Sequence, residues 1–388
     1  MVNLYEKLGV TQLINAWGNA TIIGGSIMPL EVLEAMKSAS DAYVDLDDLL
    51  KKAGQKIADM IGVESAFITS GGAAAVVIST AACIAGKDPA KIRCLPDTKG
   101  MRNEVIILRA HYCFYEQQIR QAGGKIVEIG QARSSFLWEL EQAINDQTAA
   151  VFYFADSETT RGSLPLIDII KIAHYKKVPV LVDAASELPP VSNLHRFTKM
   201  GVDLVGFSGG KDIRGPQNSG LIIGRKDLIE ACALNSCPNN SIGRSMKVSK
   251  ETIVGLVKAL EIYLSQDFDA EMEKWSKQVD YWVESLSKLS CVSVKRGFPN
   301  ISLYGMSPVC IPKAYIIWDE EERRLKKEQV IDILQKGNPG IAVNPWPKRG
   351  IALNPQMLRD GEEKIVARRL IEVFSEICGE SSVSKVKY

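Results

Sequence analysis

The chain has 388 residues, of which 46% are hydrophobic and 24% charged, the balance of a globular protein with room for a large core and more than one domain. Lysine and arginine (47) nearly cancel aspartate and glutamate (46), so the formal charge is +1 and nucleic-acid binding by phosphate neutralisation is not expected. No secretion signal opens the sequence, and no apolar run reaches the roughly 18 residues that span a bilayer. We therefore expect a cytoplasmic protein with neither a membrane nor a nucleic-acid partner.

Cysteine and histidine give no sign of a metal or redox centre. The eight cysteines are scattered along the chain, and no two of them form a C-x-x-C pair. The three histidines, His111, His174 and His195, are too dispersed for a metal cluster. We expect buried free thiols, as in a reducing compartment, and no metal site.

Residues 1–25 are expected to form an N-terminal arm, since Leu13–Asn19 leads into a glycine-rich turn. Such an arm suits a segment that lies across a cleft, which makes Asn15 and Thr21 candidates for substrate contact. Helical apolar spacing follows at Pro29–Met36 and at Val44–Ile61.

A short apolar run ending at Thr69 breaks into Ser70, Gly71, Gly72 and Ala73, and an alanine-rich helix follows. Small residues let the backbone approach a ligand, and the exposed N–H groups at a helix start favour a phosphate. An ordinary loop before a tightly packed helix is the alternative interpretation. In combination with the strand ends described below, the pattern favours phosphate binding.

Strand and helix patterns then alternate as far as Gly224, which predicts a mostly parallel sheet covered by helices on both faces. The last of these strands is expected to run antiparallel. The predicted strands are Val105–Leu108, Lys125–Ile129, Ala149–Phe154, Val180–Asp183, Val202–Gly206 and Gly220–Gly224, and the predicted helices are Gln117–Gln121, Leu137–Ile144 and Leu166–Tyr175.

Beyond residue 255 the order of elements changes. We therefore predict a larger α/β domain over residues 26–255 and a smaller α+β domain over residues 256–388, the latter with a modest sheet covered by helices on one face. Its expected elements are a long helix at Leu256–Leu289, strands at Val292–Val294, Ala314–Trp318, Ile341–Val343 and Gly350–Leu353, and helices at Lys327–Lys336 and Asp360–Ile377.

Two strand ends carry the chemistry. One apolar strand closes in Asp183, and the next closes in Ser208-Gly209-Gly210-Lys211. Ligands on open α/β sheets lie outside the carboxyl ends of the strands. A lysine amine that forms a Schiff base, together with a carboxylate that keeps a pyridine nitrogen protonated, is the pair that pyridoxal 5'-phosphate requires. The alternatives are a solvated turn lysine and an aspartate that caps a turn.

Neighbouring residues complete the predicted site. Ala185 is small enough to lie beneath the cofactor ring, Ser186 is a partner for the ring oxygen, and Ser208 is a partner for the phosphate. His111 follows a strand and a turn, where its planar side chain suits stacking on the ring. A turn hydroxyl bonded to its own backbone, and an ordinary histidine, remain the alternatives at Ser208 and His111.

Two other motifs do not fit this region. A P-loop, G-x-x-x-x-G-K-[ST], would need glycine at position 205 and serine or threonine at 212, where the chain has Val205 and Asp212. A hydrolase elbow around Ser208 lacks histidine and acid partners in a convincing order.

We expect an arginine to bind the substrate carboxylate, because its planar guanidinium group can donate hydrogen bonds to both carboxylate oxygens. Arg349 and Arg359, which flank Asn354-Pro355, are the candidates in the smaller domain. Arg109 and Arg120 are further candidates for lining the cleft.

Taken together, the motifs resemble the selenocysteine synthase (L-seryl-tRNA selenium transferase) family over nearly the whole chain. The matching segments are Ile14–Asn19, Thr69–Ala75, Gln121–Gly130, Asp183–Ala185, Phe207–Gly220 and Ile242–Lys250. The resemblance implies a fold type I pyridoxal-phosphate enzyme, a homodimer or larger, with its active site between subunits. It also implies that Lys211 is the Schiff-base lysine, that Asp183 is its ring-nitrogen partner, and that Arg244 supplies a phosphate or substrate contact to a neighbouring subunit.

One departure from the family bears on function. Bacterial selenocysteine synthases carry an extra amino-terminal helical domain that grips tRNA, whereas this chain enters the Leu13 segment almost at once. The resemblance is then greater to relatives such as D-glucosaminate-6-phosphate ammonia-lyase. We therefore expect a lyase that eliminates across Cα and Cβ of a small β-hydroxy amino acid to give a 2-oxo acid and ammonia. Aldol cleavage, racemisation, β-replacement and selenium transfer on seryl-tRNA remain the alternatives.

Overall fold

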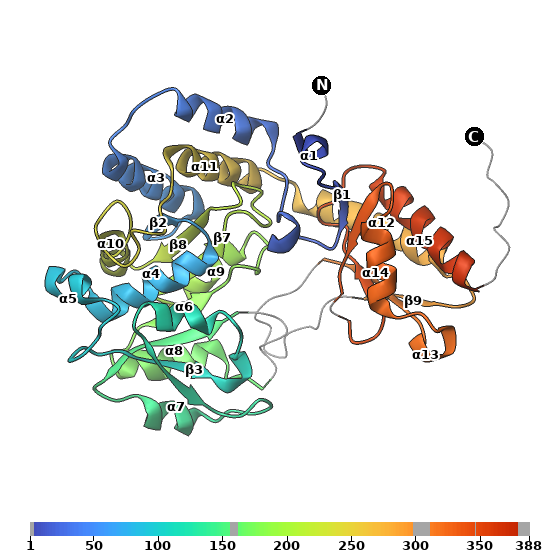
Figure 1. Ribbon diagram of the computed structural model, residues 1–388. Coiled ribbons are helices and arrows are strands. Elements are labelled where there is room, and N and C mark those ends of the chain that lie inside the picture. Colours follow the sequence, from blue (N-terminus) through green and yellow to red (C-terminus); the bar gives the residue numbers. More distant parts are fainter. Residues whose placement is uncertain (1–3, 156–161, 298–310, 346, 379–388) are drawn as a thin grey trace. The chain divides into compact units, whose positions relative to one another are not determined.

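The computed structural model describes residues 4–155, 162–297, 311–345 and 347–378. The chain divides into two compact units (Figure 1), a larger one over Ser26–Gln266 and a smaller one that combines residues up to Gly25 with the described residues from Asp267 onward. The sequence predicted a division after residue 255 and a separate arm. The division falls later because helix α11 (Lys250–Leu264) packs on helices α2 (Leu30–Ser40) and α3 (Leu46–Ile61) of the larger unit.

The larger unit is built on a seven-stranded sheet in the order β2-β8-β7-β6-β5-β3-β4. Strand β8 is antiparallel to both of its neighbours, and the other pairs are parallel, as the sequence predicted. The strands are β2 (Ser65–Thr69), β3 (Glu104–Leu108), β4 (Lys125–Ile129), β5 (Thr148–Phe154), β6 (Val180–Asp183), β7 (Leu204–Ser208) and β8 (Gly220–Gly224).

Helix α4 (Gly72–Ala85) is the central helix of this unit. It packs against β2, β5, β6, β7 and β8 and is buried over almost its whole length, as expected for a helix that is apolar on every side. The other helices of the unit are α5 (Pro89–Cys94), α6 (Glu116–Gln121), α7 (Leu137–Ala143), α8 (Leu166–Tyr175), α9 (Asn193–Met200) and α10 (Lys226–Leu234).

The smaller unit has two small sheets. Strand β1 (Leu13–Ala16), from the segment predicted as an arm, pairs in parallel with β11 (Gly340–Val343), and a second sheet has the order β12-β10-β9. Buried Trp282, Trp318 and Phe374 contribute to the core between these strands and their helices. The remaining elements are α1 (Leu4–Lys7), β9 (Ser293–Gly297), β10 (Lys313–Ile317), β12 (Ile351–Leu353), α12 (Phe268–Leu286), α13 (Glu320–Arg323), α14 (Lys327–Gln335) and α15 (Glu362–Cys378).

The long helix predicted at Leu256–Leu289 is wrong, since two helices, α11 and α12, occupy this stretch. The break has a local cause. The Asp267 side chain accepts a hydrogen bond from the backbone N–H of Ala270 at 3.0 Å and so caps the start of α12. Of the helices described, none is both long and apolar enough to cross a membrane.

Candidate active site

The candidate site lies at the carboxyl edge of the seven-stranded sheet. Strands β2, β3, β5, β6 and β7 all point the same way, because β8 runs antiparallel to both β2 and β7. Asp183, the last residue of β6, is in register with Gly206 of β7, and Lys211 follows the end of β7 by three residues. The topology therefore places the two predicted residues at the same edge of adjacent strands.

Lys211 and the segment that follows Asp183 are in direct contact. The Lys211 Nζ donates a hydrogen bond to Ser186 Oγ at 2.6 Å. Asp183 Oδ1 accepts a hydrogen bond from the backbone N–H of Ala185 at 2.9 Å, and both Asp183 and Lys211 are partly exposed. An amine, a hydroxyl and a carboxylate thus come together from two strand ends.

A cradle of small residues adjoins this group. A Cβ added at Gly72 would lie 3.1 Å from the Cβ of Ala185 and 3.9 Å from the Cβ of Ser208, so only a residue without a side chain fits there easily. Gly71 has φ of +131°, a conformation that side chains rarely adopt. The predicted phosphate loop at Gly72, the residue predicted to lie beneath the ring (Ala185) and the residue predicted to bond the phosphate (Ser208) are therefore neighbours.

The start of α4 supplies donors to the same cradle. Its 14 residues begin at Gly72, and no side chain of the described residues caps its first turn, where Ala73 is exposed and Ser70 precedes it partly exposed. The N–H groups of an uncapped first turn bind anions well. The residues present fit pyridoxal 5'-phosphate, with an amine, a carboxylate, a narrow cradle and an uncapped helix start whose N–H groups suit a phosphate.

His111 lies beyond the end of β3 and is fully buried. Its ring meets Tyr153 edge-on, with ring centroids 4.3 Å apart and an interplanar angle of 86°. Neither ring nitrogen has a hydrogen-bond partner among the described residues, and burial lowers the pKa of His111 to about 3. The ring is therefore neutral near pH 7, and its stacking on a cofactor stays a prediction.

Arg244 is exposed and lies on the loop before α11. Its Nη1 is 3.9 Å from Cys237 Sγ, and it lines a cavity of about 680 Å³ together with Arg93 and Ser241. Lys211 does not line that cavity. A contact of Arg244 with the cofactor of a neighbouring subunit stays a prediction.

The predicted substrate residues Asn15, Thr21, Arg349 and Arg359 all belong to the smaller unit. The Asn15 side chain closes a local turn, since its Oδ1 accepts from the backbone N–H groups of Trp17 and Gly18 at 3.0 Å. Arg349 and Arg359 are exposed. Their roles toward a substrate stay predictions.

The two other cleft candidates each form an ion pair within the larger unit. Arg109 pairs with Glu128 at 3.0 Å, and Arg120 pairs with Glu116 at 3.2 Å. Arg109 and Glu128 are both partly exposed, so this pair contributes little to stability, whereas Glu116 is buried and Arg120 is about half exposed. The lining of a cleft by either arginine stays a prediction.

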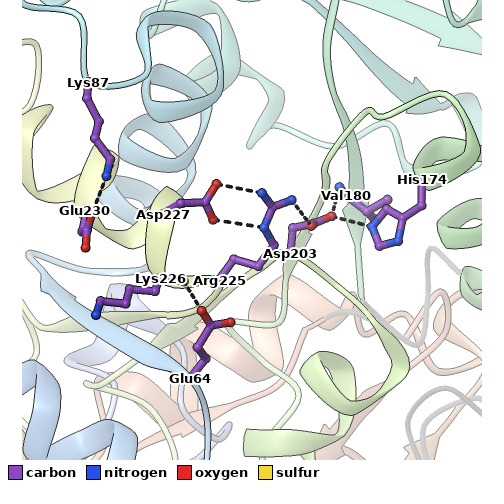
Figure 2. Close-up of polar contacts among 9 residues, drawn as sticks. All are labelled: Glu64, Lys87, His174, Val180, Asp203, Arg225, Lys226, Asp227 and Glu230. Carbon is purple, nitrogen blue, oxygen red and sulfur yellow. Dashed lines mark hydrogen bonds and ion pairs between the residues drawn. The ribbon is translucent and has the colours of Figure 1, made fainter.

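At the opposite edge of the sheet lies a charged network that the sequence analysis missed (Figure 2). Asp203 is 2% exposed and accepts hydrogen bonds from His174 Nε2 at 2.8 Å, the N–H of Val180 at 2.7 Å and Arg225 Nη1 at 2.8 Å. Hydrogen bonds to Asp227 and Asp203 raise the pKa of Arg225 above its ordinary value. The sequence contains one signal of this network. Asp203 interrupts the apolar run Val202–Val205, and a charge buried in such a run must be paired.

Two of the described cysteines are chemically quiet. Burial raises the pKa of the Cys83 thiol to about 12, with Asp203 adding to the effect, and burial also raises that of Cys232. Such thiols stay protonated and are poor nucleophiles. Cys291 takes part in a disulfide bond, so the expectation of free thiols throughout was wrong for this residue.

The fold defines the class of protein. A solved structure of D-glucosaminate-6-phosphate ammonia-lyase superposes with a TM-score of 0.82 at 32% sequence identity, covering 97% of this chain and 100% of the other. The larger and smaller units together have the architecture of the fold type I pyridoxal-phosphate enzymes. The protein is thus an enzyme with pyridoxal 5'-phosphate as its cofactor.

Sequence comparison gives the family. The family model for L-seryl-tRNA selenium transferase matches residues 13–277, and the chain belongs to this family. A D-glucosaminate-6-phosphate ammonia lyase of Salmonella typhimurium is 39% identical over 266 residues, which cover 67% of this chain and 70% of that protein. A 5'-C-glycyluridine monooxygenase-decarboxylase of a Streptomyces species is 30% identical over 380 residues, covering 95% of this chain and 92% of that protein.

Proposed function

We propose that this enzyme is an ammonia-lyase that acts by α,β-elimination on a small β-hydroxy amino acid, such as the phosphate of an amino-sugar acid. The observation that carries the proposal is the Lys211–Ser186 contact beside Asp183 at the sheet edge. The 39% identity to an ammonia lyase that acts on a compound of this kind supports it.

Each residue of the site has a role in this reaction. Lys211 would hold the cofactor covalently, Asp183 would keep its ring nitrogen protonated, and the start of α4 with Ser208 would hold its phosphate. The bound cofactor supplies an electron sink for the pair left behind when a bond at Cα breaks. The remaining steps are proton movements that the chain itself performs.

The proton path begins at Lys211. In its uncharged form, the Lys211 amine would accept the proton from Cα of the substrate, and its hydrogen bond to Ser186 would orient the nitrogen lone pair. The protonated Lys211 would then donate this proton to the Cβ hydroxyl, which would leave as water. The released unsaturated amine then takes up water and yields the 2-oxo acid and ammonia.

We also propose that the active form is a homodimer or a larger homo-oligomer that acts on small molecules and not on tRNA. Several large apolar side chains of the larger unit are exposed in the single chain, among them Ile27 (62%), Leu30 (66%) and Tyr43 (102%). Apolar side chains that are exposed in a single chain are available for burial at an interface between copies. Sedimentation equilibrium tests the assembly, and a tRNA gel shift at physiological salt tests the second statement.

The decisive experiment for the reaction has two parts. Borohydride treatment of the loaded enzyme, followed by peptide mass spectrometry, should find reduced cofactor on Lys211. A screen of D- and L-β-hydroxy amino acids, including phosphorylated amino-sugar acids, should then find release of a 2-oxo acid and ammonia in equal amounts. Cofactor fixed at another residue, or no 2-oxo acid from any member of the screen, would contradict the proposal.

A second candidate rests on the Streptomyces relative, whose match extends over almost the whole of both chains. That relative is named for oxygenation with decarboxylation of a glycyl nucleoside. The two candidates differ in their need for oxygen. An elimination proceeds in an anaerobic chamber, whereas turnover that stops without oxygen and releases carbon dioxide would favour the second candidate.

A further inference from the structure

Lys211 lies in a compact loop between β7 and β8 that is closed by its own backbone. The N–H of Gly209 donates to the carbonyl of Ser219 at 2.9 Å, and the N–H of Gly215 donates to the carbonyl of Gly209 at 2.8 Å. The N–H of Arg214 donates to the carbonyl of Lys211 at 3.0 Å, and Arg214 has φ of +55°. A non-glycine residue in this conformation indicates a loop whose shape its surroundings impose.

One face of α11 supports this loop. Thr252, Leu256, Ala259 and Tyr263 have the spacing of a single helical face and are buried. A Cβ added at Gly209 would lie 2.6 Å from Leu256 Cδ1, so the loop backbone rests directly on the helix.

The last residue of this face makes a polar contact beside Lys211. The Tyr263 hydroxyl donates a hydrogen bond to Asp212 Oδ2 at 2.8 Å, and the two residues are 1% and 7% exposed. A buried carboxylate is costly unless it is hydrogen-bonded, and a bond to a charged acceptor is among the stronger ones. Since Asp212 is joined to Lys211 by one peptide bond, the contact constrains the backbone from which the lysine side chain leaves.

We propose that Tyr263 is a positioning residue for Lys211, acting through Asp212. The phenol holds the Asp212 carboxylate against α11, and this keeps the Lys211 amine within hydrogen-bond distance of Ser186. The inference rests on the proposed role of Lys211 for its catalytic consequence. The placement of the amine itself is testable in the cofactor-free protein.

The test compares four variants with the wild type. Tyr263→Phe removes only the hydroxyl, Asp212→Ala removes the acceptor, and the double variant removes both. The matched control is Tyr175→Phe, which removes a hydroxyl from a residue of α8 that is 85% exposed. Urea unfolding first establishes the range in which each variant is folded.

The first readout is the rate at which a trace amine-acetylating reagent labels Lys211 in cofactor-free protein, measured by peptide mass spectrometry across pH. We expect Tyr263→Phe and Asp212→Ala to label about threefold faster than the wild type, because loss of one hydrogen bond frees the amine. The double variant should match the faster single variant, since either single change already removes the contact between Tyr263 and Asp212. Tyr175→Phe should label like the wild type.

The second readout is turnover of the loaded enzyme, where kcat should fall about tenfold with KM within about twofold of the wild-type value. A Tyr263→Phe variant that is less stable but has wild-type labelling and kcat would overturn the inference and leave the contact a structural one. Borohydride fixation in the wild type answers separately whether Lys211 carries the cofactor. If borohydride does not fix the cofactor on Lys211, the proposed function is contradicted. The labelling rates alone then decide whether Tyr263 positions the Lys211 amine.

Discussion

Strands β6 and β7 have a carboxylate at each edge of the sheet, Asp183 at the carboxyl edge and Asp203 at the amino edge. Asp203 is buried and receives three hydrogen bonds, two of them from His174 and Arg225. Asp183 is partly exposed and lies beside an amine, a hydroxyl and a cradle of small residues. A charge enclosed by protein donors stabilises the fold, whereas a charge left partly open beside Lys211 is available to a ligand.

This contrast separates the expected effects of mutation. Substitutions at the carboxyl edge should change turnover and leave stability nearly intact. Substitutions at the amino edge should lower stability and leave the turnover of folded protein intact.

The largest effect is expected at Lys211. Lys211→Ala should lower turnover at least about 10⁴-fold, because it removes both the covalent partner of the cofactor and the proposed base. Lys226→Ala is the matched control at the amino edge, where the side chain is exposed and the backbone N–H donates to Glu64. Steady-state assays and urea unfolding of both variants check the prediction, and a Lys211→Ala enzyme with normal turnover would contradict it.

Asp183→Asn should lower kcat by about 10²- to 10³-fold, since the neutral amide no longer holds a proton on the cofactor ring. The free energy of unfolding should change by less than about 1 kcal/mol, because the side chain is partly exposed. A variant with wild-type kcat and a large loss of stability would place Asp183 in the same structural class as Asp203.

Asp203→Asn should lower the free energy of unfolding by about 3 kcal/mol, because it leaves a buried network without its central charge. Asp227→Asn is the control, since Asp227 is more than half exposed and should matter by less than about 1 kcal/mol. Urea titration measures both. Equal effects of the two variants would show that the network around Asp203 is not the stabilising unit.

The pH dependence of the free energy of unfolding tests the burial of His111. Burial lowers its pKa from 6.5 to about 3, so the folded protein keeps the ring neutral while the unfolded chain protonates it. The contribution of His111 to stability is therefore complete above its unfolded pKa and is lost as the pH falls from about 6.5 toward 3. His111→Phe should reduce the slope of unfolding free energy against pH in this window by up to about 1.4 kcal/mol per pH unit. Urea titrations at pH 7, 6, 5 and 4 measure this slope. If His111→Phe and the wild type have the same slope, the burial of a neutral His111 ring is contradicted.

The sequence determined much of the fold and predicted the central pair of the candidate site. The alternation of apolar runs with helical spacing predicted a mostly parallel sheet with an antiparallel strand at Gly220–Gly224, and both were confirmed. Asp183 and Lys211 were predicted as a pair because Asp183 closes one apolar strand and Lys211 comes shortly after the next. In a parallel sheet, the ends of successive strands meet at one edge, so a local pattern was enough to bring them together.

Only the tertiary structure decided the contacts between distant segments. Tyr263 and Asp212 are 51 residues apart, and His174 and Asp203 are 29 apart, so no local pattern links them. The pairing of β1 with β11 likewise joins two segments that are far apart in the sequence, residues 13–16 and residues 340–343. Periodicity reports which face of an element is apolar, but the partner of a buried polar group depends on how whole elements pack, and that is set by the sum of many weak contacts across the core.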